Sequence, residues 1–101
     1  MSMLGLARRA GRLSMGHDMA LKAVKEKKAK LVIFSGDISP RLTEEFERAC
    51  SCENIKTVKI PETINEIHMA LGYKAGVITV NDENFSIRIQ ELVKEELANG
   101  D

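Results

Sequence analysis

The sequence of 101 residues has no tryptophan, one tyrosine and three phenylalanines, so its interior has to be built mainly from aliphatic side chains. Two prolines and seven glycines leave no proline-rich or glycine-rich linker. No apolar run approaches the ~20 residues that cross a bilayer, and the apolar segment within residues 1–13 is too short for a secretory signal. These absences predict a cytoplasmic protein with no membrane contact, folded as a single domain over residues 1–101.

The two cysteines and two histidines do not indicate a metal site. If Cys50 and Cys52 lie on a helix, their side chains point about 200° apart, which does not suit a disulfide between them. His17 and His68 are distant from both cysteines in the sequence, so no zinc ligand set is complete. We expect Cys50 to be a core residue and Cys52 to be incidental, with a redox role as the alternative.

No grouping of residues supports catalysis. The patterns G-x-G-x-x-G, P-loop and G-x-S-x-G, which mark nucleotide sites and hydrolase nucleophiles, do not occur after any predicted strand. His17 is followed by Asp18, but adjacent residues on a helix point in different directions, and no nucleophile is indicated nearby. The prediction is a protein that is not an enzyme and that uses no cofactor and no metal.

The charges cancel over the whole chain but not along it. Residues 1–30 hold eight Lys and Arg and two acidic residues, a balance of 8 − 2 = +6, whereas residues 31–101 hold seven and thirteen, a balance of 7 − 13 = −6. A basic region of this kind is typical of proteins with a polyanionic partner. The alternative is that these charges are the solvated faces of two helices.

Short apolar runs alternate with amphipathic stretches along the chain. The amphipathic stretches predict helices, at residues 3–10, 17–27, 40–53, 64–71 and 83–98. The apolar runs predict strands, at residues 13–15, 31–34, 57–60 and 76–80. The later strands are apolar on both faces, so we expect an α/β protein with helices on both faces of a small central sheet.

Several helix ends are marked by capping residues. Ser39 is a favoured N-cap and Pro40 is favoured at the first helical position. Thr63 and Glu66 have the spacing of a capping box, in which each side chain satisfies a backbone N–H of the other residue. Asn54 can end the preceding helix in a left-handed conformation.

The sequence around Gly16 predicts a strand, a glycine turn and the start of a helix. Glycine allows a sharp turn there, and the first N–H groups of the helix then point outward and attract anions such as phosphate. Lys22 follows Asp18 by four residues and can share a helix face with it. One interpretation is a nucleic-acid contact, and the other is an ordinary strand-to-helix turn beside a solvated lysine.

Three segments carry a family resemblance: LGLARRAGRLSMG at residues 4–16, LKAVKEKKAKLVIFSGDISP at 21–40 and GVITVND at 76–82. They resemble the ribosomal protein L-seven-Ae / L-thirty-e superfamily, and within it the small bacterial YlxQ-like branch, over residues 3–98. The resemblance implies a three-layer α/β/α sandwich with a small four-stranded mixed sheet. It also implies a protein that binds structured, kink-turn-like RNA of the ribosome or of translation.

The resemblance further implies an RNA surface formed by the segment Gly16–Lys22 and completed by the loop Gly72–Gly76. There Gly16 would let the RNA backbone approach closely, and Lys22 would contact a phosphate or a base edge. Arg12 and Lys25 are added to this surface because of their charge. The full set of predicted RNA-binding residues is Arg12, Gly16, His17, Asp18, Met19, Lys22, Lys25, Tyr73 and Lys74.

The chain also departs from the family pattern. Kink-turn binders usually carry Asn-Glu where this chain has Asp18 and Met19, and of these two only Asp18 can accept a hydrogen bond from guanine. Tyr73 lies in a shortened loop, where it can stack on an unpaired base or pack on the protein itself. The alternative function is therefore a protein-interaction module on the same fold, serving a ribosomal or transcription-associated protein.

Overall fold

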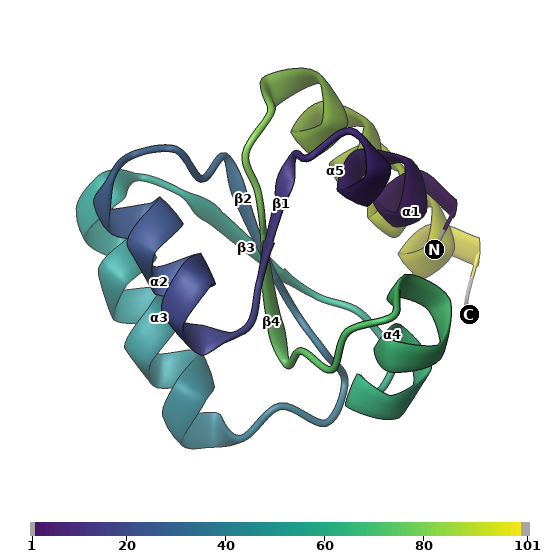
Figure 1. Ribbon diagram of the computed structural model, residues 1–101, viewed down its shortest axis with the longest axis horizontal. Coiled ribbons are helices and arrows are strands. Elements are labelled where there is room, and N and C mark those ends of the chain that lie inside the picture. Colours follow the sequence, from purple (N-terminus) through teal and green to yellow (C-terminus); the bar gives the residue numbers. More distant parts are fainter. Residues whose placement is uncertain (1, 100–101) are drawn as a thin grey trace.

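The computed structural model describes residues 2–99, with side chains as far as residue 95. Four strands form one mixed sheet in the order β1-β4-β2-β3, and helices cover both of its faces, which gives the expected three-layer α/β/α sandwich (Figure 1). None of the described helices is long and apolar enough to cross a membrane. The elements are α1 Ser2–Arg9, β1 Leu13–Met15, α2 His17–Lys25, β2 Leu31–Phe34, α3 Pro40–Glu53, β3 Lys56–Lys59, α4 Ile64–Leu71, β4 Val77–Val80 and α5 Glu83–Asn99.

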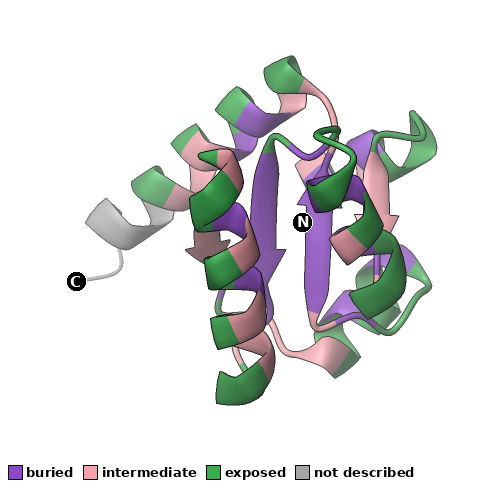
Figure 2. Ribbon diagram, turned by 90° about the vertical axis from the view of Figure 1, so that its left-hand side faces the viewer, coloured by how far each residue is buried: buried purple, intermediate pink, exposed green. Residues whose placement is uncertain are grey.

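The central strands β2 and β4 are buried along their whole length, because their alternating side chains enter two separate cores (Figure 2). Leu31 and Ile33 of β2 pack with residues of α1, α4 and α5 on one face. Val32 and Phe34 pack with α2 and α3 on the other face. An aliphatic interior was expected from the composition, and each of these cores is mainly aliphatic.

The direction of the strands places the two loops of the predicted RNA surface together. Strand β1 is antiparallel to β4, with Met15 opposite Ile78, so the end of β1 lies beside the start of β4. The N–H of Gly16 donates to the carbonyl oxygen of Val77 at 3.0 Å, which continues this pairing into the turn. The loop before β4, which contains Tyr73, therefore lies at the same end of the sheet as the first turn of α2.

The predicted caps are confirmed. The Ser39 hydroxyl accepts a hydrogen bond from the Leu42 N–H at 3.3 Å, with Pro40 as the first residue of α3. Thr63 and Glu66 form both bonds of a capping box at the start of α4, at 3.2 and 3.0 Å. Asn54 ends α3 with a left-handed φ of 59°.

Several boundaries differ from the prediction by one or two residues: α1 lies one residue earlier than expected, β4 begins one residue later, and β3 and α2 differ for physical reasons. Strand β3 was expected at 57–60 with both faces apolar, but it spans Lys56–Lys59 and is an edge strand with both of these lysines exposed. It pairs only with β2, so no strand of the described sheet lies along its other edge. Helix α2 ends at Lys25 rather than at residue 27, because Lys27 takes a left-handed φ of 63°.

The C-terminal helix begins as predicted and continues to Asn99, one residue beyond the expected end. The sequence also predicts Leu97 at helical spacing on this helix and a frayed tail at Asn99–Asp101; Asn99 is still helical, and the Leu97 side chain and residues 100–101 lie outside the part of the chain that the structure describes. Cys50 is a core residue, as predicted, and Cys52 is exposed. Burial, and to a smaller extent the nearby Glu47, raises the pKa of the Cys50 thiol to about 11.

Gly36 provides a test of the fold, because it lies where two backbone segments approach closely. A Cβ at this position would lie 2.6 Å from the carbonyl oxygen of Pro61. We expect Gly36→Ala to lower the free energy of unfolding by about 1–3 kcal/mol in urea titrations. Gly5→Ala is the matched control, since its Cβ meets open space within helix α1 and should raise stability by about 0.5–1 kcal/mol. Equal stability of Gly36→Ala and the parent would contradict this close approach.

Candidate nucleic-acid interface

The first turn of α2 presents backbone N–H groups that no side chain caps. Its N-cap is Gly16, which has φ 92° and ψ 165° and no side chain to accept a hydrogen bond. Helices α3, α4 and α5 differ, because Ser39, Thr63 and Asp82 each accept a bond from an N–H of the first turn. Uncapped N–H groups at the positive end of a helix dipole form a site that favours an anion.

Tyr73 lies against the Gly16 turn. A Cβ on Gly16 would be 3.5 Å from both Cε1 and Oη of Tyr73, so the phenol ring covers the side of the turn from which a side chain would project. Nevertheless Tyr73 is 47% exposed. The ring thus packs partly on the protein, and almost half of the residue's surface stays exposed.

Arg8 of helix α1 also reaches this turn, and the sequence did not indicate it. Its guanidinium carbon lies 6.0 Å from the centroid of the Tyr73 ring, within the range of a cation–π contact. It also contacts the sulfur of Met15, the residue before the turn. No local pattern could have predicted this arrangement, because it depends on α1 and the loop before β4 meeting at one end of the sheet.

His17 connects the start of α2 to α3. Its Nδ1 lies 3.0 Å from Asp18 Oδ1 and its Nε2 lies 2.9 Å from Glu45 Oε1, while the ring packs edge-on against Phe46. The hydrogen bonds to Asp18 and then Glu45 raise the pKa of His17 above its usual 6.5. The stabilisation from this contact is therefore present below the unfolded-state pKa and is lost as the pH rises through the raised value.

The next residues of α2 form an exposed surface on the side away from the core. The Asp18 side chain is fully exposed and Met19 is 54% exposed. At 100° per residue, Asp18, Lys22 and Lys25 form one stripe along the helix, opposite the buried alanines and valine of α2. Within residues 2–95, neither lysine forms an ion pair, so both charges are available to an anionic ligand.

The last two predicted residues, Lys74 and Arg12, lie at opposite ends of the sheet. Lys74 is exposed beside Tyr73 in the loop before β4, close in sequence to the Gly16 contact. Arg12 is not brought to this turn, because strand β1 separates it from Gly16. Its guanidinium lies 4.0 Å from the Asp82 carboxylate at the far end of the sheet, and its carbonyl oxygen accepts the Asn81 N–H.

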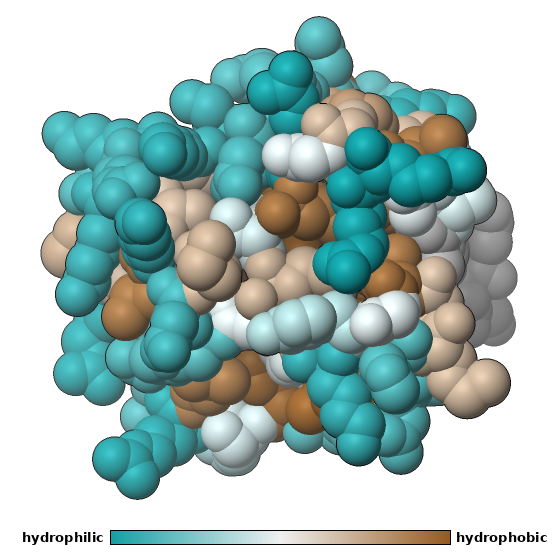
Figure 3. Space-filling view, in the orientation of Figure 1, coloured by the Kyte–Doolittle hydropathy of each residue, from teal (hydrophilic) through white to brown (hydrophobic). Residues whose placement is uncertain are grey.

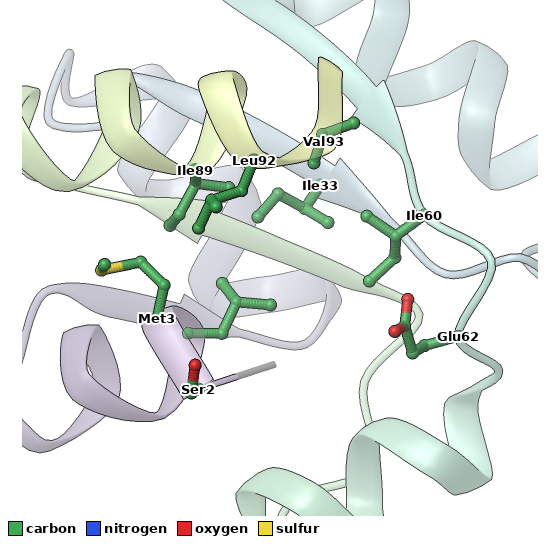
Figure 4. Close-up of a pocket in the computed structure, with 9 residues that line it drawn as sticks. Ser2, Met3, Ile33, Ile60, Glu62, Ile89, Leu92 and Val93 are labelled. Carbon is green, nitrogen blue, oxygen red and sulfur yellow. The ribbon is translucent and has the colours of Figure 1, made fainter. Parts of the chain in front are cut away.

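The pocket in Figure 4 lies between α1 and α5, on the face of the sheet opposite α2 and α3. It has a volume of about 190 Å³ and is lined mainly by apolar residues such as Ile33, Ile60 and Ile89. Ser2 and Glu62 are the polar residues at its edge. In the part of the chain that the structure describes, no three His, Cys, Asp or Glu side chains are grouped so that they could hold a metal ion.

Known proteins are similar to this chain in sequence and in fold. The model of the ribosomal protein L7Ae/L30e/S12e/Gadd45 family matches residues 1–87. RNA-binding protein YlxQ of Bacillus subtilis (strain 168) is 27% identical over 92 residues, which are 90% of this chain and 91% of that protein. Large ribosomal subunit protein eL30 of Yarrowia lipolytica (strain CLIB 122 / E 150) is 28% identical over 81 residues, 78% of this chain and 74% of that protein.

Two solved structures have the same fold. A protein of unknown function from Bacillus halodurans C superposes with a TM-score of 0.85 at 30% identity, covering 92% of this chain and 94% of that one. The 15.5kD RNA binding protein of Giardia lamblia gives a TM-score of 0.75 over 92% of this chain and 82% of that one, at 22% identity. With its sandwich fold and a family match over most of its length, the chain belongs to the ribosomal protein L7Ae/L30e/S12e/Gadd45 family.

Proposed function

We propose that this protein binds RNA without catalysing a reaction, and that it recognises structured, kink-turn-like ribosomal or translation-related RNA in the cytoplasm. The observation that carries the proposal is the meeting of three features at one end of the sheet. They are the uncapped first turn of α2, the half-exposed Tyr73 and, one turn further along α2, the exposed Lys22, which forms no ion pair within residues 2–95. The names of the relatives, an RNA-binding protein and a ribosomal subunit protein, support the same class of ligand.

Each feature suits a different part of an RNA. A phosphate group can accept hydrogen bonds from the free N–H groups after Gly16, and Lys22 can bind the next phosphate along the helix. Tyr73 can stack on an unpaired base, since bases in RNA loops and bulges are accessible to aromatic side chains. Arg8, beside that ring, adds a positive charge at the same place.

Asp18 is the residue best placed to recognise a base edge. Its carboxylate accepts hydrogen bonds and is oriented by His17 while remaining fully exposed, so it can accept from the N–H groups of a guanine. Met19 offers no hydrogen bond of this kind, but its exposed side chain can pack against a base or sugar. This pair distinguishes the proposed recognition from that by Asn-Glu in kink-turn binders.

The second candidate function is a protein-interaction module on the same fold. The exposed apolar surface of Met19 and Tyr73 near the Gly16 turn favours it, as does the net charge of zero. The two functions differ in their response to salt. Binding to RNA phosphates weakens steeply as salt rises, whereas an apolar contact with a protein does not.

The first prediction concerns Lys22. Lys22→Ala should weaken binding to a kink-turn RNA about tenfold, because a charge-assisted hydrogen bond to phosphate is lost. It should also lower the slope of log affinity against log salt by about one unit. The measurement is a fluorescence anisotropy titration against a kink-turn and an A-form duplex of equal length at two salt concentrations.

Lys59→Ala is the matched control for this titration, because Lys59 is exposed on β3 at the other edge of the sheet and should leave affinity unchanged. Tight and salt-sensitive binding that prefers the kink-turn supports the proposal. Equally weak binding of both RNAs by the parent protein, unaffected by Lys22→Ala, would refute it and favour the protein-interaction function.

The second prediction concerns pH. Protonated His17 adds a positive charge at the start of α2, so RNA affinity should rise, by up to about tenfold, as the pH falls from about 8 to about 6. The hydrogen bonds to Asp18 and Glu45 raise the pKa of His17 above its usual 6.5, so the ring gains its proton at a higher pH than a free imidazole does. His17→Gln should remove the dependence, whereas His68→Gln, on α4, should retain it. A pH dependence that survives in His17→Gln would exclude His17 as its source.

The third prediction concerns base recognition. Replacing Asp18→Asn together with Met19→Glu should raise the preference for the kink-turn over the duplex by about tenfold or more. The amide both donates and accepts hydrogen bonds, and the new carboxylate accepts from a second guanine, each worth about 1–3 kcal/mol. The two single variants are the controls and should give smaller gains. If the double variant shows no gain, these side chains do not face the base edges.

A further inference from the structure

The far end of α2 carries more positive charge than its start. Residues 22–30 hold five lysines and one glutamate, a balance of 5 − 1 = +4. All five lysines are exposed, while Ala29 is buried and holds the loop against the core. Hydrophilic residues predominate on the side of the molecule where α2 and α3 lie, with a few apolar residues between them (Figure 3).

Lys27 occupies a backbone position that normally selects glycine. Its φ is 63°, and the N–H groups of Lys27 and Lys28 donate to the carbonyl oxygens of Val24 and Ala23 at 3.1 and 2.9 Å. This bonding pattern is a Schellman motif, whose left-handed residue is usually glycine because a Cβ is unfavourable there. A lysine at this position therefore weakens the local structure relative to glycine.

No ion pair among residues 2–95 accounts for a lysine at this position. Among residues 2–95, Lys27 forms no ion pair, and neither does Lys30. Lys28 contacts Glu26 at 3.2 Å within the same loop. Glu53 and Glu83 share a polar hollow with Lys27 and Lys30 without pairing to them, and they bound the charged region on that side.

We propose that Lys27, Lys28 and Lys30, here called the distal lysine patch, bind phosphates of a duplex stem of the RNA held at the Gly16 turn. This inference rests on the proposed function. Helix α2 has nine residues and is about 14 Å long, so a ligand contacting both of its ends has to be extended and regularly charged. An RNA stem meets this requirement, and Lys22 and Lys25 fill the interval between the two ends.

The sheet supports the placement of this patch. The N–H of Lys30 donates to the carbonyl oxygen of Val80, and the N–H of Asn81 donates to that of Arg12. Arg12 and the patch therefore lie at the same end of the sheet, opposite the Gly16 turn, as the course of β1 and α2 in Figure 1 shows. Arg12, partly neutralised by Asp82, then belongs to the stem contact rather than to the turn.

The experiment compares a short RNA, which has one kink-turn and minimal stems, with a long RNA, in which the stem on one side of the same kink-turn is lengthened by one helical turn. The comparison is made once for each side of the kink-turn. The parent protein should bind the longer RNA about tenfold more tightly. The triple variant Lys27→Gly, Lys28→Ala and Lys30→Ala should lose this gain and about three units of salt slope on the long RNA, with its affinity for the short RNA unchanged. Lys94→Ala, on α5 across the sheet, is the matched control.

The single variant Lys27→Gly separates a binding role from a structural one. Because glycine adopts the left-handed conformation without strain, the melting temperature of the Lys27→Gly variant should be several degrees higher than that of the parent protein. Its affinity for the long RNA should nevertheless fall about threefold, since one phosphate contact is lost. A higher melting temperature with unchanged affinity would show that Lys27 does not contact RNA.

The remaining outcomes are distinct. If the parent protein binds both RNAs equally and the triple variant changes neither affinity, the distal lysine patch is refuted while the proposed function stands. If the parent protein binds neither RNA, the proposed function fails and this inference fails with it. If Lys22→Ala weakens both RNAs while the triple variant weakens only the long one, the two contacts are separate, as proposed.

Discussion

The structure depends on burying the paired strands β2 and β4 on both faces. Their backbone N–H and C=O groups have no access to water, so each strand needs a neighbour on either side. Strand β1 supplies the second neighbour of β4, and β3 that of β2, while helices enclose both faces. Pairing β1 against β4 then brings the Gly16 turn and the loop of Tyr73 to one end of the sheet, so the candidate site is a consequence of how the core is closed.

Much of the fold could be predicted because its signals are local. The caps at Ser39 and Thr63 and the left-handed Asn54 depend on residues a few positions apart, and all three are confirmed. The predictions failed where the cause is not local. Lys27 gives no sign in the sequence that it takes a glycine conformation, and the exposure of β3 follows from its place at the edge, which only the sheet order decides.

The candidate site, like the fold, could be predicted from the sequence only where its residues are close together along the chain. Gly16 and the first residues of α2 were predicted together because they are consecutive. The contacts of His17 with Glu45, and of Arg8 with Tyr73, join residues far apart in the sequence, so no pattern indicated them. Arg12 was grouped with this surface by charge alone, and a three-residue strand is enough to carry it to the opposite end of the sheet.

Helix α2 receives little local stabilisation at either end. With nine residues it is too short to be stable alone, so its packed alanines and the His17 contact hold it in place. Its start has no side-chain cap, and its end has a lysine where glycine is favoured. The helix dipole explains why Lys22 and Lys25 stabilise the last turn. That interaction weakens beyond the last turn of a helix, so it accounts less well for Lys28 and Lys30, whereas the polyanion proposed along α2 would interact with both groups of lysines.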